Sequence, residues 1–173
     1  AETSYNQAIA LKPDFANAHN NLGVTLKELG RLDRAIASYV QAVALKSDFA
    51  EAYINLGIAI QNVRFNSSNP NLYSPLSQLL TVGNFTRPDD VAPSILSLLK
   101  QDVQIKDLLL KKKSSLSLNE VNSIIRSLAK LPLLHDLMRI CPLPDLQFEG
   151  LFVLMRSLLL KNLDKLEVSP ELI

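Results

Sequence analysis

Apolar and polar positions follow a helical period along most of the chain, and in its first third the pattern repeats. Residues 13–23 read Pro-Asp-Phe-Ala-Asn-Ala-His-Asn-Asn-Leu-Gly, and 34 positions later residues 47–57 read Ser-Asp-Phe-Ala-Glu-Ala-Tyr-Ile-Asn-Leu-Gly. Residues 4–12 return at the same distance as residues 38–46. This period predicts that one helical unit of structure stacks on the next.

Each unit is expected to contain two closely packed helices. Leu22 and Leu26 in the first helix, and Ile36 and Tyr39 in the second, recur at helical spacing and fill the seam between them. Gly30 suits the short turn that joins the two helices. Since one such pair cannot bury its apolar face alone, we expect its stability to come from stacking.

The unit resembles the tetratricopeptide repeat (TPR), in which an aromatic residue, Leu-Gly, Ala-x-x-x-aromatic and a proline follow in order. The complete unit reads His19, Leu22-Gly23, Leu26, Ala35, Tyr39 and Ala42, with Ser47 where the family usually has proline. A partial unit precedes it, and a third begins at Tyr53 and then departs from the pattern. The resemblance implies TPR helical hairpins, an α-solenoid, over residues 1–83. Repeats of the O-GlcNAc transferase type are similar.

The composition changes after residue 62 from alanine-rich to leucine-rich. The first 62 residues contain 12 Ala and 7 Leu, whereas the remaining 111 contain 2 Ala and 27 Leu. Residues 64–70 are predicted to form a loop, and residues 71–82 a degenerate or capping helix of the repeat segment. Residues 84–173 are expected to form a second, Leu-rich helical segment, so that the whole chain is all-α and truncated at both ends.

Helix start signals divide this Leu-rich segment into five predicted helices. Asp102 and Asp145 are suitable N-caps, Ser117 and Glu120 form a capping box, and Pro132 suits a first turn. The five helices are expected over about residues 86–100, 102–112, 117–130, 132–142 and 145–162, from start signal to last periodic position.

Two stretches of the Leu-rich segment, residues 84–92 and 142–150, resemble the region that precedes the methyltransferase domain in bacterial TPR proteins. That resemblance implies an alternative function. The chain would then be the non-catalytic N-terminal region of a transferase, most simply a methyltransferase, whose activity lies beyond residue 173.

Charge and composition disfavour several classes of partner. The chain has 18 Lys and Arg against 17 Asp and Glu, a net charge of +1, so no overall attraction to nucleic acid or an anionic membrane is expected. The longest apolar runs, of about five residues, are far shorter than the ~20 needed to span a bilayer. The single cysteine, Cys141, cannot close an internal disulfide, which favours a cytoplasmic location.

No recognisable catalytic motif is present in the sequence. The five glycines are too far apart for a phosphate-binding loop, and neither G-x-S-x-G nor H-E-x-x-H occurs. His135 and Cys141 lie six residues apart across a short helix with no orienting group, so packing roles are favoured over nucleophilic catalysis. His19 replaces a packing aromatic, and two histidines without ligand spacing do not make a metal site. We therefore expect no enzyme activity, cofactor or metal in this chain.

Asn21 and Asn55 occupy the same place in successive units, immediately before Leu-Gly. In TPR proteins this helix lines the concave groove, and the resemblance implies an asparagine ladder there. An amide can donate to a peptide carbonyl and accept from a peptide N–H. The alternative is that these asparagines bridge neighbouring helices. By helical spacing, the expected groove consists of Asn17, Asn20, Asn21, Val24, Lys27, Glu28, Glu51, Ile54, Asn55, Ile58, Gln61 and Asn62.

The predicted function is thus a protein-protein interaction module or scaffold that binds a peptide in this groove. A second interface is expected on the last predicted helix, because ten of the fifteen positions from 146 to 160 are apolar. We expect its face with Phe152, Met155 and Leu159 to meet either a second copy of the chain or a downstream domain.

Overall fold

The computed structural model of the chain describes residues 1–81, 85–110, 118–128, 130–140, 149–150 and 153. Within these ranges the regular elements are all helical, which confirms the all-α prediction for the described residues. In chain order they are α1 (Glu2–Leu11), α2 (Ala16–Glu28), α3 (Leu32–Leu45), α4 (Ala50–Ile60), the 3-10 helix η1 (Pro70–Leu72), α5 (Tyr73–Thr81), α6 (Pro88–Leu99), α7 (Val103–Leu110), α8 (Leu118–Leu128) and α9 (Pro132–Ile140).

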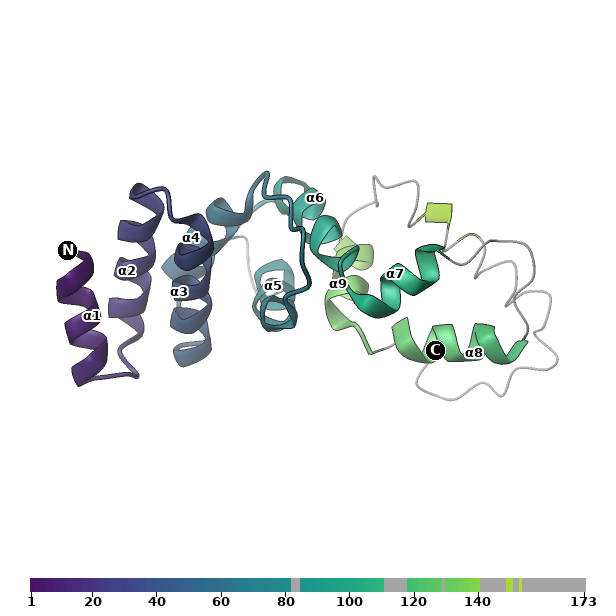
Figure 1. The fold of residues 1–173 in the computed structure, drawn as a ribbon, viewed down its shortest axis with the longest axis horizontal. Helices are drawn as coiled ribbons and strands as arrows, with labels where there is room; N and C mark the ends of the chain where they lie inside the picture. The colour runs from purple at the N-terminus through teal and green to yellow at the C-terminus, as the bar shows by residue number, and fades with distance from the viewer. Residues whose placement is uncertain (82–84, 111–117, 129, 141–148, 151–152, 154–173) are drawn as a thin grey trace.

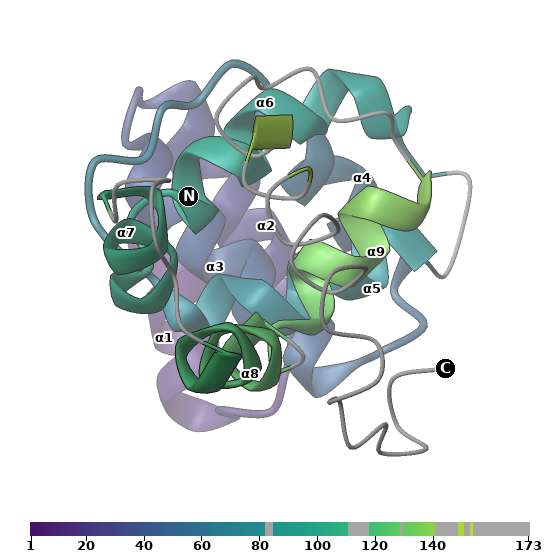
Figure 2. The same cartoon turned by 90° about the vertical axis from the view of Figure 1, so that its right-hand side faces the viewer.

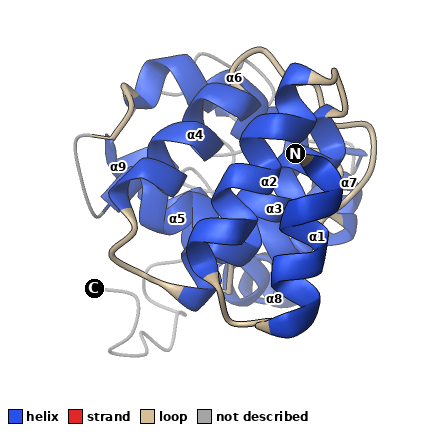
Figure 3. Ribbon diagram, turned by 90° about the vertical axis from the view of Figure 1, so that its left-hand side faces the viewer, coloured by secondary structure: helices blue, strands red, loops and turns tan. Residues whose placement is uncertain are grey.

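The helices follow one another along an elongated molecule. Figure 1 shows α1 and α2 at the N-terminal end, followed by α3 and α4, which overlap in this view, then α5, α6 and α9, and then α7 and α8 at the opposite end. Figure 3 looks along the row from α1, and Figure 2 looks from the end that carries α7 and α8. Along the molecule, α9 therefore lies before α7 and α8, although it follows them in sequence.

The same turn joins successive hairpins of the repeat. Phe15 and Phe49 hold the N-cap positions of α2 and α4 with nearly equal backbone angles, φ −83° and ψ 83° against φ −80° and ψ 80°. Their N–H groups donate to the carbonyls of Lys12 and Lys46 at 3.2 and 3.1 Å. Each lysine Nζ lies over the ring of its phenylalanine, at 5.8 and 5.2 Å from the centroid. The sequence period is thus a structural period.

Two glycines permit the close contact between α2 and α3. Gly30 has a φ of +72°, a left-handed conformation that glycine adopts without strain, and its predicted role in the turn is confirmed. Gly23 lies directly against the ring of Tyr39, which is buried to 1% exposure between the two helices.

The third unit begins like the second and then departs from it. Tyr73 is in phase with Tyr39, but it is half-buried where Tyr39 is fully buried, and its hydroxyl donates to the Asp102 carboxylate at 2.9 Å. The backbone of Gly57 faces Thr86, which comes from the segment before α6. The same segment provides the phenylalanine ring that stacks on Tyr53 in α4, with centroids 5.4 Å apart.

The predicted helix over residues 71–82 is present as α5, but it packs most extensively on α9. Leu76 and Leu79 on α5 and Leu133 and Leu137 on α9 are all buried at 1% exposure or less. The Ser77 hydroxyl on α5 also donates to the carboxylate of Asp136 on α9. Helices that are more than fifty residues apart in sequence therefore form one packed layer.

The predicted starts of the later helices agree with the structure where it describes them. Asp102 caps α7, because its Oδ1 accepts from the N–H groups of Gln104 at 2.9 Å and Ile105 at 3.4 Å. Pro88 and Pro132 open α6 and α9. The capping serine of the predicted box at 117–120 and most of the predicted helix at 145–162 lie outside the described residues, although positions 149, 150 and 153 are helical.

One apolar cluster runs through the molecule from α2 to α9. It begins at Leu22, includes Tyr39, Leu56 and Ile95, and ends at Leu137. Side chains from both predicted segments therefore share a core. The boundary expected between residues 83 and 84 falls at positions that the structure does not describe and stays a prediction.

Candidate protein-binding site

The predicted groove residues lie on α2, on α4 and on the two positions after α4. Their exposure is uneven. The exposed members are Asn17, Asn21, Lys27, Glu28, Glu51, Ile54, Ile58 and Asn62, the half-buried ones are Val24, Asn55 and Gln61, and the buried one is Asn20. Eight of the twelve side chains are thus accessible to a partner.

Asn20 joins α2 to α4 through a short chain of hydrogen bonds. Its Nδ2 donates to Glu51 Oε1 at 3.0 Å, and its Oδ1 accepts from Asn55 Nδ2 at 3.0 Å. Asn20 is only 1% exposed, so both ends of a buried amide have partners, as polar groups in protein interiors normally do. These two hydrogen bonds tie together the two helices that carry the predicted groove.

Asn21 and Asn55 are equivalent in sequence but not in structure. The Asn21 side chain is exposed, whereas Asn55 is half-buried and bridges to Asn20. The helical spacing predicts Asn20 only as one groove residue among twelve and does not indicate its bridging role. No signal in the sequence marks it, since Asn20 and Asn55 are 35 positions apart, one more than the period, and are therefore not equivalent in the repeat.

Two isoleucines form an exposed apolar pair on α4. Ile54 is 40% exposed and Ile58 is 45% exposed, and four positions of helix place their side chains next to each other on one face. Asn55, between them in sequence, belongs to the hydrogen-bond chain, so the apolar pair lies beside the rigid connection between α2 and α4.

Comparison with known proteins identifies the repeats. A family model described as the TPR repeat matches residues 1–30 and 25–63. The two matches cover residues 1–63, which are called the TPR segment from here on. No curated protein and no solved structure matches the chain. The likeness of the repeats to the O-GlcNAc transferase type, and of the later segment to the region before a methyltransferase domain, both stay predictions.

TPR segments generally mediate contacts between proteins and are typically non-catalytic, and their repeats stack into extended binding surfaces. The predictions of a TPR protein, of a helical-repeat fold and of protein partners therefore agree with the family match. The groove residues, the absence of enzyme activity and the cytoplasmic location are not tested by it.

Burial raises the pKa values of tyrosines that support the TPR segment. Burial, with a smaller contribution from the negative charge of Glu28, raises the pKa of Tyr39 to about 12. Burial also raises the pKa of Tyr53. Both rings therefore stay neutral near pH 7, where they act as packing groups with a hydroxyl.

The structure places the two histidines differently, and the packing role predicted for His135 is not what it shows, because that side chain is exposed. His19 is half-buried and its Nε2 lies 3.1 Å from the carbonyl oxygen of Pro13. His135 is exposed on α9, and Cys141 lies outside the described residues. Among the described side chains there is no group of three or more potential metal ligands, and none of the described helices is long and apolar enough to cross a membrane.

The second predicted interface belongs to the last predicted helix. Phe152, Met155 and Leu159 all lie outside the described residues. Their contact with a second copy or with a downstream domain stays a prediction from the sequence.

Proposed function

We propose that the TPR segment binds a segment of a partner protein on the face formed by α2 and α4. The observation that carries this proposal is the exposed pair Ile54 and Ile58, which lies beside the helix bridge made by Asn20 and Asn55. Side chains of this size favour burial against a partner, because removing apolar surface from water is stabilising by roughly 25 cal/mol per Å².

The surroundings of the isoleucine pair suit a peptide that carries apolar side chains. Asn17 and Asn21 are exposed on α2 and can donate to and accept from a peptide backbone whatever its sequence. Lys27 and Glu51 are exposed as well, so the rim carries charges of both signs. An apolar centre with a polar rim is the usual construction of a protein interface.

The hydrogen-bond chain favours binding because it holds the surface in place beforehand. Asn20 ties α2 to α4 from a buried position, and Gly23 allows α2 to pack tightly on the second helix of its hairpin. A surface that is already fixed loses less conformational entropy when a partner binds. The proposed site is therefore a rigid one, on helices.

The test is site-specific photocrosslinking in cells of the source organism. A photoreactive phenylalanine analogue is placed at Ile58, and at Leu45 in a control variant, since Leu45 is 43% exposed on a different helix. We expect a defined protein to crosslink at position 58 and not at position 45. The same set of proteins at both positions, or none at position 58, would contradict the proposal.

The captured protein then allows a quantitative measurement. The double variant Ile54→Ser, Ile58→Ser should weaken its binding roughly 5- to 150-fold, which corresponds to about 1 to 3 kcal/mol for two partly buried side chains. Leu45→Ser should leave the affinity unchanged. Asn21→Ala should weaken binding several-fold, since a hydrogen bond contributes on the order of 1 kcal/mol.

A further inference from the structure

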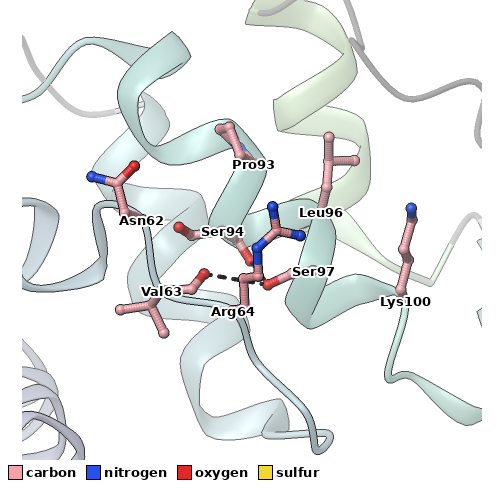
Figure 4. A pocket seen from close by; sticks show the side chains of 8 residues that line it. All are labelled: Asn62, Val63, Arg64, Pro93, Ser94, Leu96, Ser97 and Lys100. Atoms are coloured by element: carbon pink, nitrogen blue, oxygen red, sulfur yellow. Dashed lines mark hydrogen bonds between the residues drawn. The ribbon is translucent and has the colours of Figure 1, made fainter.

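A cleft of about 550 Å³ lies between α6 and the chain segment that follows α4, shown in Figure 4. Its walls come from that segment and from one side of α6. The lining residues are Asn62, Val63, Arg64, Pro93, Ser94, Leu96, Ser97 and Lys100. Apart from Asn62 they are not among the groove residues, so this cleft is a separate feature of the molecule.

Hydrogen bonds to Ser97 hold the cleft open. The Ser97 hydroxyl donates to the carbonyl of Ser94 at 2.7 Å and accepts from the N–H of Phe65 at 3.0 Å, while the Val63 carbonyl is 3.5 Å away. Asn62 has a φ of +64°, which turns the chain out of α4 and across α6. The hydrogen bond between Phe65 and Ser97 and the turn at Asn62 therefore fix the chain segment that faces α6.

Ser94 is a buried polar group that lacks a partner. Its side chain lines the cleft and is 1% exposed, yet its hydroxyl makes no hydrogen bond to the described part of the chain. A serine in a helix can bond to the carbonyl one turn earlier, and Ser94 does not. Since buried hydroxyls are almost always hydrogen-bonded, the natural partner is a molecule in the cleft.

The charges that line the cleft are all positive. Arg64 and Lys100 are cationic, and no acidic residue is among the lining residues. Figure 4 shows Arg64 reaching over the cleft from the extended segment and Lys100 standing at the end of α6. A guanidinium group matches the two oxygens of a carboxylate or phosphate. The rest of the wall is apolar, from Val63, Pro93 and Leu96.

We propose that this cleft binds a small organic anion, with its carboxylate or phosphate held by Arg64 and Lys100 and hydrogen-bonded by Ser94. Its apolar portion lies against Pro93 and Leu96. The volume is within the range of roughly 300 to 1,000 Å³ that is usual for small-molecule sites. The inference does not depend on the proposed protein-binding function, because Arg64, Ser94 and Lys100 are not groove residues and the ligand is different.

The experiment is an NMR titration of the full ¹⁵N-labelled chain with phenyl phosphate, benzoate and neutral benzyl alcohol. We expect saturable shifts of the amides of Arg64, Phe65 and Ser97 with one or both anions, and none with the alcohol. Whichever anion binds more tightly identifies phosphate or carboxylate as the preferred group. Added NaCl should weaken the binding, because salt screens exposed charges.

Three variants then test the assigned residues. Arg64→Gln should weaken the binding about tenfold or more, as expected for loss of a charge-assisted hydrogen bond, and Ser94→Ala should weaken it several-fold. Arg126→Gln, an exposed control on α8, should change nothing. Unchanged circular dichroism confirms that each variant is folded. The proposal is overturned if neither anion gives saturable shifts, if benzyl alcohol binds equally, or if Arg64→Gln or Ser94→Ala leaves the affinity unchanged.

Discussion

A Cβ atom on Gly23 would lie 2.5 Å from Cε1 and 2.7 Å from Cδ1 of Tyr39, far inside the contact distance of two carbon atoms. One period later, a Cβ atom on Gly57 would lie 3.2 Å from Cβ of Thr86. The two glycines are equivalent in sequence. They differ in tolerance, because a rigid buried ring faces the first and a small side chain faces the second.

The first prediction concerns these two glycines. Gly23→Ala should lower the free energy of unfolding by about 1 to 3 kcal/mol, because a methyl group forces Tyr39 or the helix to move. Gly57→Ala should have a smaller effect, since Thr86 can shift by a few tenths of an ångström and alanine favours the helix by about 1 kcal/mol. Urea unfolding of both variants measures the difference. Equal losses at the two positions would contradict the packing described.

The second prediction separates two adjacent asparagines. Asn20→Ala leaves Glu51 and Asn55 without their partner, and should lower the free energy of unfolding by about 1 to 3 kcal/mol. Asn21→Ala, at an exposed position, should stay within about 0.5 kcal/mol of the wild type. Chemical denaturation of the two variants under the same conditions is the measurement. If Asn21→Ala were the more damaging variant, the bridge would be assigned to the wrong residue.

The third prediction concerns stability at high pH. Burial, together with the charge of Glu28, raises the pKa of Tyr39 to about 12, and burial is also the main reason why the pKa of Tyr73 is raised to about 12. In the unfolded chain both hydroxyls ionise near pH 10. The contribution of these two tyrosines to the free energy of unfolding is therefore fully present below pH 10. It is lost as the pH rises from about 10 to 12.

A tyrosine variant checks this pH dependence. Urea midpoints of the wild type should be level near pH 8 to 9 and fall above pH 10, and those of Tyr39→Phe should fall less steeply over the same window. Phenylalanine keeps the ring against Gly23 and removes the ionisable hydroxyl. Parallel curves for the two proteins would show that Tyr39 does not cause the loss.

The fourth prediction tests the anchor of the extended segment. Ser97→Ala removes the acceptor of the Phe65 N–H, so that amide should exchange with solvent about tenfold faster, the change that corresponds to roughly 1.4 kcal/mol. Ser123→Ala, at an exposed position of α8, is the control and should leave Phe65 unaffected. Hydrogen exchange followed by NMR gives both rates. An unchanged rate in Ser97→Ala would mean that other contacts hold the segment.

The repeats were predictable because they depend on local signals. Gly30 in the turn and Asp102 at a helix start act within a few residues of themselves, and the structure confirms both. The bridging role of Asn20 was not predictable from equivalence between repeats. Its partner Asn55 corresponds in sequence to Asn21, so the offset of one position follows only from how α2 and α4 are placed.

The cleft could not be predicted from the sequence for a related reason. Ser94 and Ser97 are ordinary helix residues, and Arg64 was predicted to lie in a loop without any further role. What brings them together is the early end of α4 and the path of the chain across α6, which Asn62 begins. Nothing local in the sequence specifies that path.

The packing of α5 on α9 has a consequence for how the molecule unfolds. In a linear array each unit touches only its neighbours, so terminal units can fray without disturbing the rest. Here Ser77 on α5 is hydrogen-bonded to Asp136 on α9, and both helices carry buried leucines. Two helices that are distant in sequence are therefore held together, with α6, α7 and α8 in the stretch of chain between them. Opening α5 exposes α9 at the same moment. Among the described residues, the slowest-exchanging amides are therefore expected in α5 and α9, where the two helices pack on each other.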